Sequence, residues 1–458
     1  MNRAELLEGP IAPTLLRLAT PVLVVLAVQT AVGVAETWFV SFLGTSAIAG
    51  VALVFPLFML MTMMSNGGMG GGVSSAVARA IGAGRGRDAD ALALHAVVIA
   101  VALGALFTLG AWLGGPSLYR ALGAEGETLG NALTYSNLVF AAAIPAWIVN
   151  LLASALRGAG NVRVPAMLST AGAVVTLALS PLLIFGWGLV PGFGVAGAGY
   201  AMIAFNVIAA LALAIYVRSD ASPVRLRVQP LEWRLLADIL RVGFISAIGT
   251  IVTNLTVIGT TGFVGAFGRD AIAGYGLASR LDYLLIPLLF AIGTASVTLV
   301  GTSVGAGRHD RARRAAWTAA LVSVIAVESI GIAAALFPEA WMHLFTHEPA
   351  VVDVGTSYLV RVAPLYAFTG LGLALYFASQ GAGRMAWPFA AGVARLATVM
   401  LAAWYWTAVA HGSIEGIFWI VALGQVLLGA INAIAMASGV SWRARSTPSL
   451  SSLYRTTQ

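Results

Sequence analysis

Long apolar runs alternate with short polar segments along the whole chain. The runs 97–112 and 420–436, for example, contain no charged residue. A helix of about 20 mostly apolar residues crosses the hydrocarbon core of a bilayer, whereas strands of a membrane barrel alternate apolar and polar residues over about ten positions. The unbroken runs therefore predict transmembrane helices. We expect twelve of them, at residues 18–42, 47–70, 90–114, 131–153, 165–188, 194–217, 240–265, 271–300, 315–337, 353–378, 387–409 and 414–437.

The composition agrees with this pattern. Of the 458 residues, 59% are hydrophobic and only 9% are charged, whereas soluble domains carry about 25% charged residues. A set of water-soluble domains is therefore excluded, and so is a disordered chain, which needs low hydrophobicity and high charge. The absence of Cys excludes disulfides, thiolate metal sites and Cys nucleophiles. The expected fold class is an all-α polytopic membrane protein.

Positive charge gathers in one set of the predicted loops. All 25 basic residues are Arg, and most lie before the first span, in every second loop or after the last span. The other loops collect acids, among them Glu125, Glu127, Glu339, Glu348 and Asp353. Because cytoplasmic loops carry an excess of positive residues, both termini are expected in the cytoplasm. The net charge of +7 is then an orientation signal, and no nucleic-acid partner is expected.

The two halves of the chain repeat each other at an offset of 223 to 224 residues. The matching segments are 44–50 with 268–274, 82–85 with 305–308, and 158–160 with 381–383. Six spans per half give both halves the same orientation, with a pseudo-two-fold along the membrane normal, as in many secondary transporters. We expect two lobes around a central cleft that open alternately to either side. The predicted divisions are an N-lobe at 1–220, a cytoplasmic linker at 221–238, a C-lobe at 239–440 and a cytoplasmic tail at 441–458.

The first span and the glycine loops carry a family pattern. It runs from Leu16-Arg17-Leu18-Ala19-Thr20-Pro21 through Gln29-Thr30 and Ala35-Glu36-Thr37 to Leu43-Gly44, and continues in the paired Gly-Ala-Gly-Arg loops and in Arg157-Gly158-Ala159-Gly160. With these residues the chain resembles the multidrug and toxic compound extrusion (MATE) family over essentially its full length. The resemblance implies cation-coupled efflux of amphipathic, often cationic, organic compounds by alternating access.

The resemblance also implies that an acid in the first span is central to coupling, and Glu36 occupies that position. Many members carry Asn and Asp before a proline in the fifth span, where this chain has Thr176 and Ser180. Members with an ion site in the C-lobe carry acids in the seventh and tenth spans, where this chain has Thr253-Asn254 and Gly370. Because Na⁺ prefers several oxygens and more negative charge, we expect H⁺ as the coupling ion.

Glu36 lies about seven residues from the outer end of its predicted span, roughly 10 Å deep. Intramembrane acids are costly and are functional candidates by default. The equivalent residue of the second half is Thr260, so the repeat itself does not require an acid. Burial disfavours a charged carboxylate, and one buried acid can hold either a proton or a cationic substrate. This exclusion is the simplest basis for antiport; a neutral Glu hydrogen-bonded between helices is the alternative.

Three polar residues and a proline accompany this acid in the prediction. Thr176 and Ser180 offer hydroxyl groups from the fifth span, and Gln29 lies two helical turns before Glu36 on the same face. Pro21 is expected to kink the first span and to couple protonation of Glu36 to a change of helix shape, with a static kink as the alternative. The predicted coupling site is therefore Glu36, Thr176, Ser180 and Gln29, with Pro21 as the conformational residue.

Five further charged residues fall inside spans of the second half: Arg280, Asp282, Glu328, Arg361 and Arg395. The first four lie at similar depth on three spans and sum to zero charge, so we predict that they pair in one network. Arg395 lies nearer the cytoplasmic end and is expected to extend to the headgroups. The network is expected to fix the C-lobe helices; alternatively, Asp282 faces the cleft and binds cations.

The cleft between the lobes is expected to adapt to varied substrates. Trp38 offers an aromatic face for organic cations. Met63 belongs to a Met-rich stretch, 59–64, of a kind that repacks around different ligands, with lipid or core packing as the alternative. Asn254 and Asp282 complete the residues that we assign to the cleft.

Rival functions differ in the charged residues that they need. A lipid-linked saccharide flippase needs a cleft lined with Arg, and a Na⁺-coupled exporter needs more acids; both stay open, as does a pH-independent uniporter. An enzyme needs convergent catalytic side chains, which the pattern does not show. His343 and His347 are more typical of a solvated loop than of a metal site. We therefore expect no enzymatic activity, no metal and no cofactor besides the coupling ion, H⁺ or Na⁺.

The expected partners are the lipid bilayer and a small organic substrate, and the chain is expected to act as a monomer. The use of Arg without any Lys is typical of a GC-rich bacterial genome. We therefore expect a multi-pass protein of the bacterial inner membrane. The substrate and the resting conformation are not predicted.

Overall fold

The computed structural model describes residues 1–188 and 191–439, most of which are helical. The helices are α1 Arg3–Glu8, α2 Ile11–Ser41, α3 Thr45–Met63, the π-helix η1 Met64–Met69, α4 Gly70–Gly82, α5 Gly86–Ala121, α6 Gly126–Ala141, α7 Ala143–Gly158, α8 Arg163–Phe185, α9 Val195–Arg218, α10 Trp233–Gly265, α11 Arg269–Ala278, α12 Arg280–Gly305, α13 His309–Leu336, α14 Pro338–Met342, α15 Pro349–Val362, the 3₁₀ turn η2 Ala363–Leu365, α16 Tyr366–Gly381, α17 Ala386–Ala408 and α18 Ile414–Ala437.

The number of membrane spans matches the prediction. Within the described residues, eleven helices are long and apolar enough to cross a membrane, and α6 with α7, which meet at an angle of 44°, make a twelfth. The second span consists of α3, η1 and α4, and the tenth of α15, η2 and α16. The all-α polytopic class is therefore confirmed. The predicted tail at 441–458 lies outside the described residues.

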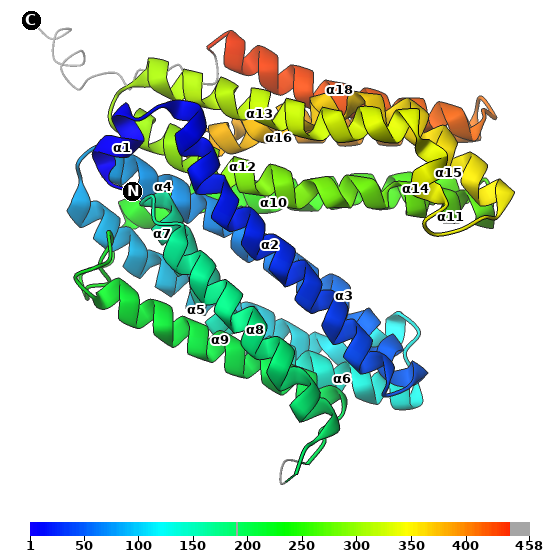
Figure 1. The fold of residues 1–458 in the computed structure, drawn as a ribbon, viewed down its shortest axis with the longest axis horizontal. Coiled ribbons are helices and arrows are strands. Elements are labelled where there is room, and N and C mark those ends of the chain that lie inside the picture. The colour runs from blue at the N-terminus through cyan, green and yellow to red at the C-terminus, as the bar shows by residue number, and fades with distance from the viewer. Residues whose placement is uncertain (189–190, 440–458) are drawn as a thin grey trace, which may run out of the picture.

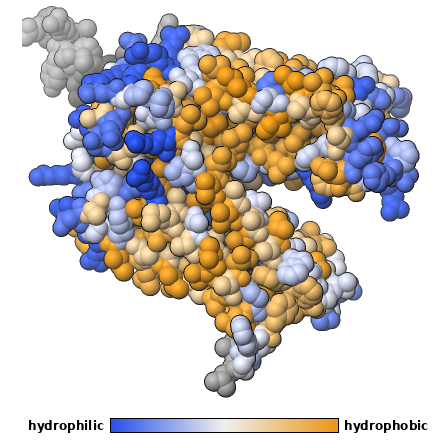
Figure 2. Space-filling view, viewed as in Figure 1, coloured by the Kyte–Doolittle hydropathy of each residue, from blue (hydrophilic) through white to orange (hydrophobic). Residues whose placement is uncertain are grey.

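The helices form two lobes that meet at one end and diverge toward the other (Figure 1). The first lobe contains α2–α9 and the second α10–α18. Figure 2 shows an open cleft between the two lobes, and the sides of this cleft are largely apolar. Hydrophilic residues gather where the lobes meet and at the tip of one lobe. The end that carries α1, where the lobes meet, is called the closed end below, and the opposite end the open end.

Glycines bring the lobes together at the closed end. A Cβ atom on Gly82 of α4 would lie 2.0 Å from the carbonyl oxygen of Thr302 on α12. A Cβ atom on Gly305 of α12 would lie 2.1 Å from the carbonyl oxygen of Arg79 on α4. Only glycine permits such an approach of two helix backbones. The matched glycines of the repeat therefore form the contact between the lobes.

α1 and α2 also connect the lobes. Arg3 on α1 donates to the carbonyl of Gly82 in the first lobe, and Arg311 of α13 donates to the carbonyl of Leu6 on α1. The first half of α2 packs its buried Leu15 and Leu18 against α12 of the second lobe. Its second half reaches α8 of its own lobe. α2 therefore contacts both lobes along one continuous helix.

The π-helix η1 explains a one-residue difference between the repeats. Gly82 follows Gly44 by 38 residues, whereas Gly305 follows Gly268 by 37. A π-helical turn holds one residue more than an α-helical turn, and η1 lies between the first two glycines. It packs against α10 of the second lobe. Such turns are frequent at functional sites.

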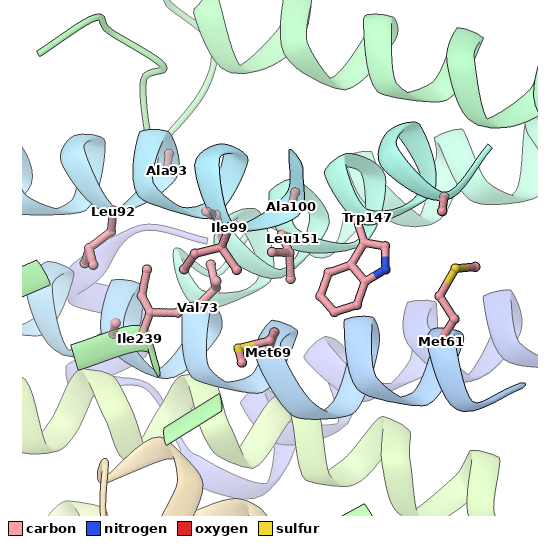
Figure 3. Packing of buried hydrophobic residues seen from close by; sticks show 14 of the residues in the cluster. Met61, Met69, Val73, Leu92, Ala93, Ile99, Ala100, Trp147, Leu151 and Ile239 are labelled. Carbon is pink, nitrogen blue, oxygen red and sulfur yellow. The ribbon is translucent and has the colours of Figure 1, made fainter. Parts of the chain in front are cut away.

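The core of the first lobe lies between α4, α5 and α7. Figure 3 shows Trp147 and Leu151 of α7 pointing toward Met69 of η1, Val73 of α4 and Ile99 of α5. Trp147 is fully buried, so it belongs to this core and not to the cleft.

Residues 219–232 connect the lobes. α10 begins at Trp233, so the last residues of the linker predicted at 221–238 are helical. The connection is tied to the first lobe, where the buried His95 of α5 accepts a hydrogen bond from the N–H of Glu232 at 2.9 Å.

Candidate functional site

Glu36 lies five residues before the end of α2, toward the open end. Ser180 of α8, which is fully buried, donates a hydrogen bond to Glu36 Oε1 over 3.3 Å. Glu36 itself is partly buried. No basic side chain pairs with Glu36 among the ion pairs of the described chain. A partly buried carboxylate without a cationic partner is neutralised most directly by a proton or by a bound cation.

The other predicted members of this site are placed differently. Thr176 lies one turn before Ser180 on the same face of α8, is 6% exposed, and its hydroxyl has no hydrogen-bond partner. Tyr135 of α6 is near enough to interact electrostatically with Glu36. Gln29 is exposed, and no hydrogen bond joins it to Glu36 among the described residues. The structure thus brings Ser180 to Glu36 and leaves Gln29 apart.

α2 continues through Pro21 as a single helix. Because Pro21 has no N–H, the carbonyl of Arg17 lacks its usual helical donor. The neighbouring Leu18 and Val22 are buried against α12 of the second lobe. Pro21 therefore lies in the half of α2 that contacts the other lobe, whereas Glu36 lies in the half that contacts α8, and a conformational role for Pro21 stays a prediction.

Three residues assigned to the cleft lie outside the lobe cores. Trp38 is 58% exposed and packs edge-on against Phe42, with ring centroids 4.9 Å apart. Met63 is 37% exposed. Asn254 is exposed, and its amide donates to the carbonyl of Thr250 in its own helix. Their assignment to substrate binding stays a prediction.

The ion-pair network predicted for the second lobe does not form. Its predicted members are Arg280, Asp282, Glu328 and Arg361. No two of them pair among the ion pairs of the described residues. Arg280 is exposed and lies over the ring of Phe345, 5.4 Å from its centroid. Arg361 donates to Ser357 of its own helix at 2.7 Å. Arg361 also interacts electrostatically with Glu415, so neither guanidinium pairs with an acid of the predicted network.

The two acids of that set have uncharged partners. The turn η2 interrupts the tenth span, so α16 begins with free N–H groups, and Glu328 accepts from the N–H of Ala367 at 2.6 Å. Tyr358 donates to one oxygen of Asp282 at 2.5 Å, and Tyr366 donates to the other. The predicted network left out these O–H and N–H donors.

The side chain of Arg395 on α17 lies elsewhere than predicted. It interacts electrostatically with Asp282 and Tyr358, and its buried Nε has no hydrogen-bond partner. Its side chain passes Gly424 of α18, where an added Cβ would lie 3.4 Å from Arg395 Cγ. The absence of a side chain on Gly424 lets Arg395 extend into the second lobe, so the expectation that it reaches the headgroups is wrong.

An ion pair at the closed end was not predicted from the sequence. Arg79 of α4 donates to Asp238 of α10 at 2.7 Å and to the carbonyl of Gly381 on α16 at 3.2 Å. Ser75 of α4 donates to the carbonyl of Gln380. These bonds join one lobe to the other. Asp238 was not predicted as the partner of Arg79, because it lay inside the predicted linker.

Comparisons with known proteins agree with this fold. A family model described as MatE matches residues 21–182 and 246–405, one stretch in each lobe. The FAD transporter of Shewanella oneidensis is 27% identical over 388 residues, which cover 82% of this chain and 83% of that protein. The probable multidrug resistance protein NorM of Thermotoga maritima is 27% identical over 357 residues, covering 77% and 76%.

A solved structure is similar over nearly the whole chain. It is described as the outward-facing conformation of a multidrug resistance MATE family transporter of the MOP superfamily. The TM-score is 0.87 at 24% identity, over 97% of this chain and 99% of the other. At this identity the likeness concerns the fold.

Proposed function

Because this chain belongs to the MatE family, we propose that it is an antiporter that exports amphipathic or cationic organic compounds in exchange for a cation, H⁺. The family consists of transporters, so the chain is a membrane transporter and not an enzyme. Drug export is supported by a relative that is a probable multidrug resistance protein. The relative that transports FAD supports a wider range of substrates.

The arrangement of the lobes supports transport by alternating access. The closed end carries the Arg-rich segments, and cytoplasmic segments are rich in positive residues. We therefore assign the closed end to the cytoplasm of a bacterium and the open cleft to the outside of its inner membrane, with the protein acting as a monomer. Rocking of the lobes closes this cleft and opens the other side.

The observation that carries the choice of coupling site is Glu36. It is an acid without a basic partner, hydrogen-bonded to a buried hydroxyl on the neighbouring span. Removing a carboxylate from water costs free energy unless the charge is compensated. A proton or a cationic substrate compensates the charge, and each excludes the other. Exchange at Glu36 therefore ties proton entry to substrate exit.

The surroundings of Glu36 favour H⁺ over Na⁺. Only Ser180 bonds to the carboxylate among the described residues, and the hydroxyl of Thr176 lies one turn away. A sodium ion needs several oxygen ligands at once, whereas a proton needs one. Na⁺ coupling is the alternative that the experiment below distinguishes.

The test is efflux from proteoliposomes under an imposed gradient. Efflux of ethidium is expected to follow a pH gradient and to ignore a Na⁺ gradient. Glu36→Gln is expected to abolish the pH-driven part, because an amide can neither bind nor release the proton. Glu125→Gln removes an exposed acid at the open end of the same lobe and is expected to leave efflux unchanged.

Two results would contradict the proposal. Efflux driven by Na⁺ alone would replace H⁺ by Na⁺ as the coupling ion. Undiminished pH-driven efflux by a well-expressed Glu36→Gln protein would remove Glu36 from the coupling mechanism.

A further inference from the structure

A narrow pocket lies where the two lobes meet. Its walls come from η1, α4 and α7 of the first lobe and from α12 and α16 of the second. The part that a water-sized group can enter is about 10 Å³, which holds about one such group. The pocket therefore admits one oxygen-sized group of a ligand.

Arg157 of α7 supplies a positive charge to this pocket. Its Nη2 donates to Asn66 at 3.1 Å and to Ser154 at 2.7 Å. The N–H groups of Nη1 and Nε have no partner among the described residues, and no carboxylate pairs with the guanidinium there. A guanidinium binds two oxygens at once only through a pair of N–H groups that includes Nη2, and both hydrogens of Nη2 are already used. Nη1 or Nε of Arg157 is therefore free to donate a single charge-assisted hydrogen bond to one oxygen of an anion.

The repeat shows that this charge is not needed for packing. At the offset of 223 residues the counterpart of Arg157 is Gln380, and both residues precede a Gly-Ala-Gly segment. Both side chains line the same pocket. The second lobe thus packs the equivalent position with a neutral residue, so the positive charge is a feature of one lobe only.

Gln380 adds a second polar observation. It is fully buried, and its amide nitrogen donates to the carbonyl of Gly67 at 3.1 Å and to Ser246 at 2.8 Å. Its Oε1 accepts no hydrogen bond. Buried polar atoms usually have a partner, and an N–H or O–H group of a bound molecule is a suitable one.

Aromatic rings complete the pocket. Phe290 of α12 and Phe377 of α16 line it and pack edge to face, with centroids 5.6 Å apart. Their faces are suited to a flat apolar group. The pocket thus combines one unpaired guanidinium, an unpaired amide oxygen and an aromatic wall.

We propose that Arg157 binds the carboxylate or phosphate of an aromatic organic anion between the lobes, so that this transporter accepts organic anions as well as cations. This proposal rests on the proposed export function and defines part of its substrate class. One oxygen of the anion accepts a hydrogen bond from Nη1 of the guanidinium, and its ring lies against the two phenylalanines, outside the part of the pocket that holds one water-sized group. Cationic substrates do not need this contact.

The experiment compares two dyes of opposite charge, ethidium and fluorescein, as substrates of the same proteoliposomes under a pH gradient. The variant Arg157→Gln gives the first lobe the residue that the second lobe already has. It is expected to lower fluorescein efflux about tenfold or more while ethidium efflux stays within about twofold. Arg157→Lys keeps the charge but loses the planar set of donors that bonds Asn66, Ser154 and the anion together, and its fluorescein efflux is expected to lie between those of the unmodified chain and Arg157→Gln. The matched control Arg163→Gln removes an exposed charge six residues away and is expected to change neither dye.

Binding to the detergent-solubilised protein separates this proposal from the coupling mechanism. Fluorescence anisotropy of fluorescein is expected to give a Kd about tenfold higher for Arg157→Gln than for the unmodified chain, whether or not a pH gradient drives transport. Failure of ethidium efflux with intact, Arg157-dependent fluorescein binding would overturn the export function and keep the site. Three results would overturn the site. Arg157→Gln could lose efflux of both dyes equally, or it could bind fluorescein as tightly as the unmodified chain. The unmodified chain could also transport ethidium but neither bind nor transport fluorescein.

Discussion

Arg79 of α4 and Asp238 of α10 form an ion pair of 2.7 Å that crosses from one lobe to the other at the closed end. The Arg79 side chain is 13% exposed, whereas that of Asp238 is 44% exposed. Because one partner is largely buried, loss of the other leaves an uncompensated charge in the contact between the lobes. The pair is also absent from any state in which this end is open. It therefore stabilises the open-cleft conformation relative to its opposite.

Replacement of Asp238 by Asn is expected to shift the population toward closure of the cleft. An ion pair of this exposure contributes about 1 kcal/mol, which corresponds to roughly a fivefold change in the ratio of the two states. The chain has no Cys, so spin labels on Glu125→Cys and Arg269→Cys, which lie at the open ends of the two lobes, report the distance between them. A larger fraction of short distances in Asp238→Asn is the expected outcome.

Arg225→Gln is the control, because the Arg225 side chain pairs with Asp220 within the connection between the lobes. Its label distances are expected to match those of the unmodified chain. A distance distribution in Asp238→Asn identical to that control would show that the ion pair does not favour either state.

Thr176→Val is expected to separate packing from coupling near Glu36. Val has nearly the shape of Thr, and the Thr176 hydroxyl is buried without a partner. Removing an unsatisfied hydroxyl is expected to leave stability unchanged or to raise it by about 1 kcal/mol, measured as a thermal unfolding midpoint in detergent. If Thr176 serves the proton site, ethidium efflux falls while stability does not. Unchanged efflux at unchanged stability would restrict the site to Glu36 and Ser180.

The interaction of Asp282 with Arg395 predicts that their contributions to stability depend on each other. Asp282→Asn removes the nearby negative charge and leaves the guanidinium uncompensated, which is expected to cost about 3 kcal/mol of stability. Adding Arg395→Gln is expected to recover part of that loss, because the two charges then disappear together. The thermal unfolding midpoints of the two single variants and the double variant measure the coupling.

Arg361→Gln provides the comparison for that cycle. Arg361 was predicted as a partner of Asp282, but it bonds to Ser357 instead. Its effect is expected to add to that of Asp282→Asn without coupling. A coupling of Asp282 to Arg361 larger than to Arg395 would restore the predicted network.

The spans and their repeat were readable from the sequence because membrane burial leaves a continuous signal. A run of apolar residues long enough to cross a bilayer has few other uses, and the paired Gly-Ala-Gly segments recur at one offset. Even the change of offset from 224 to 223 had a structural cause, the extra residue of η1. Glu36 could be selected as a candidate for the same reason, since an acid is rare in an apolar span.

The partners of buried charges were not readable in the same way. Tyr358 and Tyr366 reach Asp282 because of how α15 and α16 are rotated on either side of η2. Such rotations depend on packing, and neutral donors are too common in sequence to be singled out. Asp238 was not considered as a partner because α10 begins at Trp233, seven residues before the span predicted at 240–265. Helix boundaries are less certain than helix existence, and one boundary decided this ion pair.

The contact of α4 with α12 leads to a last prediction, that Gly82→Ala opens the closed end. The added Cβ would lie 2.0 Å from the carbonyl oxygen of Thr302, and a backbone atom cannot yield as a side chain can. Overpacking of this kind costs about 1–3 kcal/mol, and the cost falls only on the state in which α4 and α12 touch. The spin labels at the open ends are therefore expected to move closer together, as in Asp238→Asn but further. Gly110→Ala, where no atom lies within 4 Å of the new Cβ, is expected to leave the label distance unchanged and to raise the unfolding midpoint slightly, since Ala favours a helix over Gly by about 1 kcal/mol. If Gly82→Ala keeps the wide label distance of the unmodified chain, the glycine contact does not hold the lobes together.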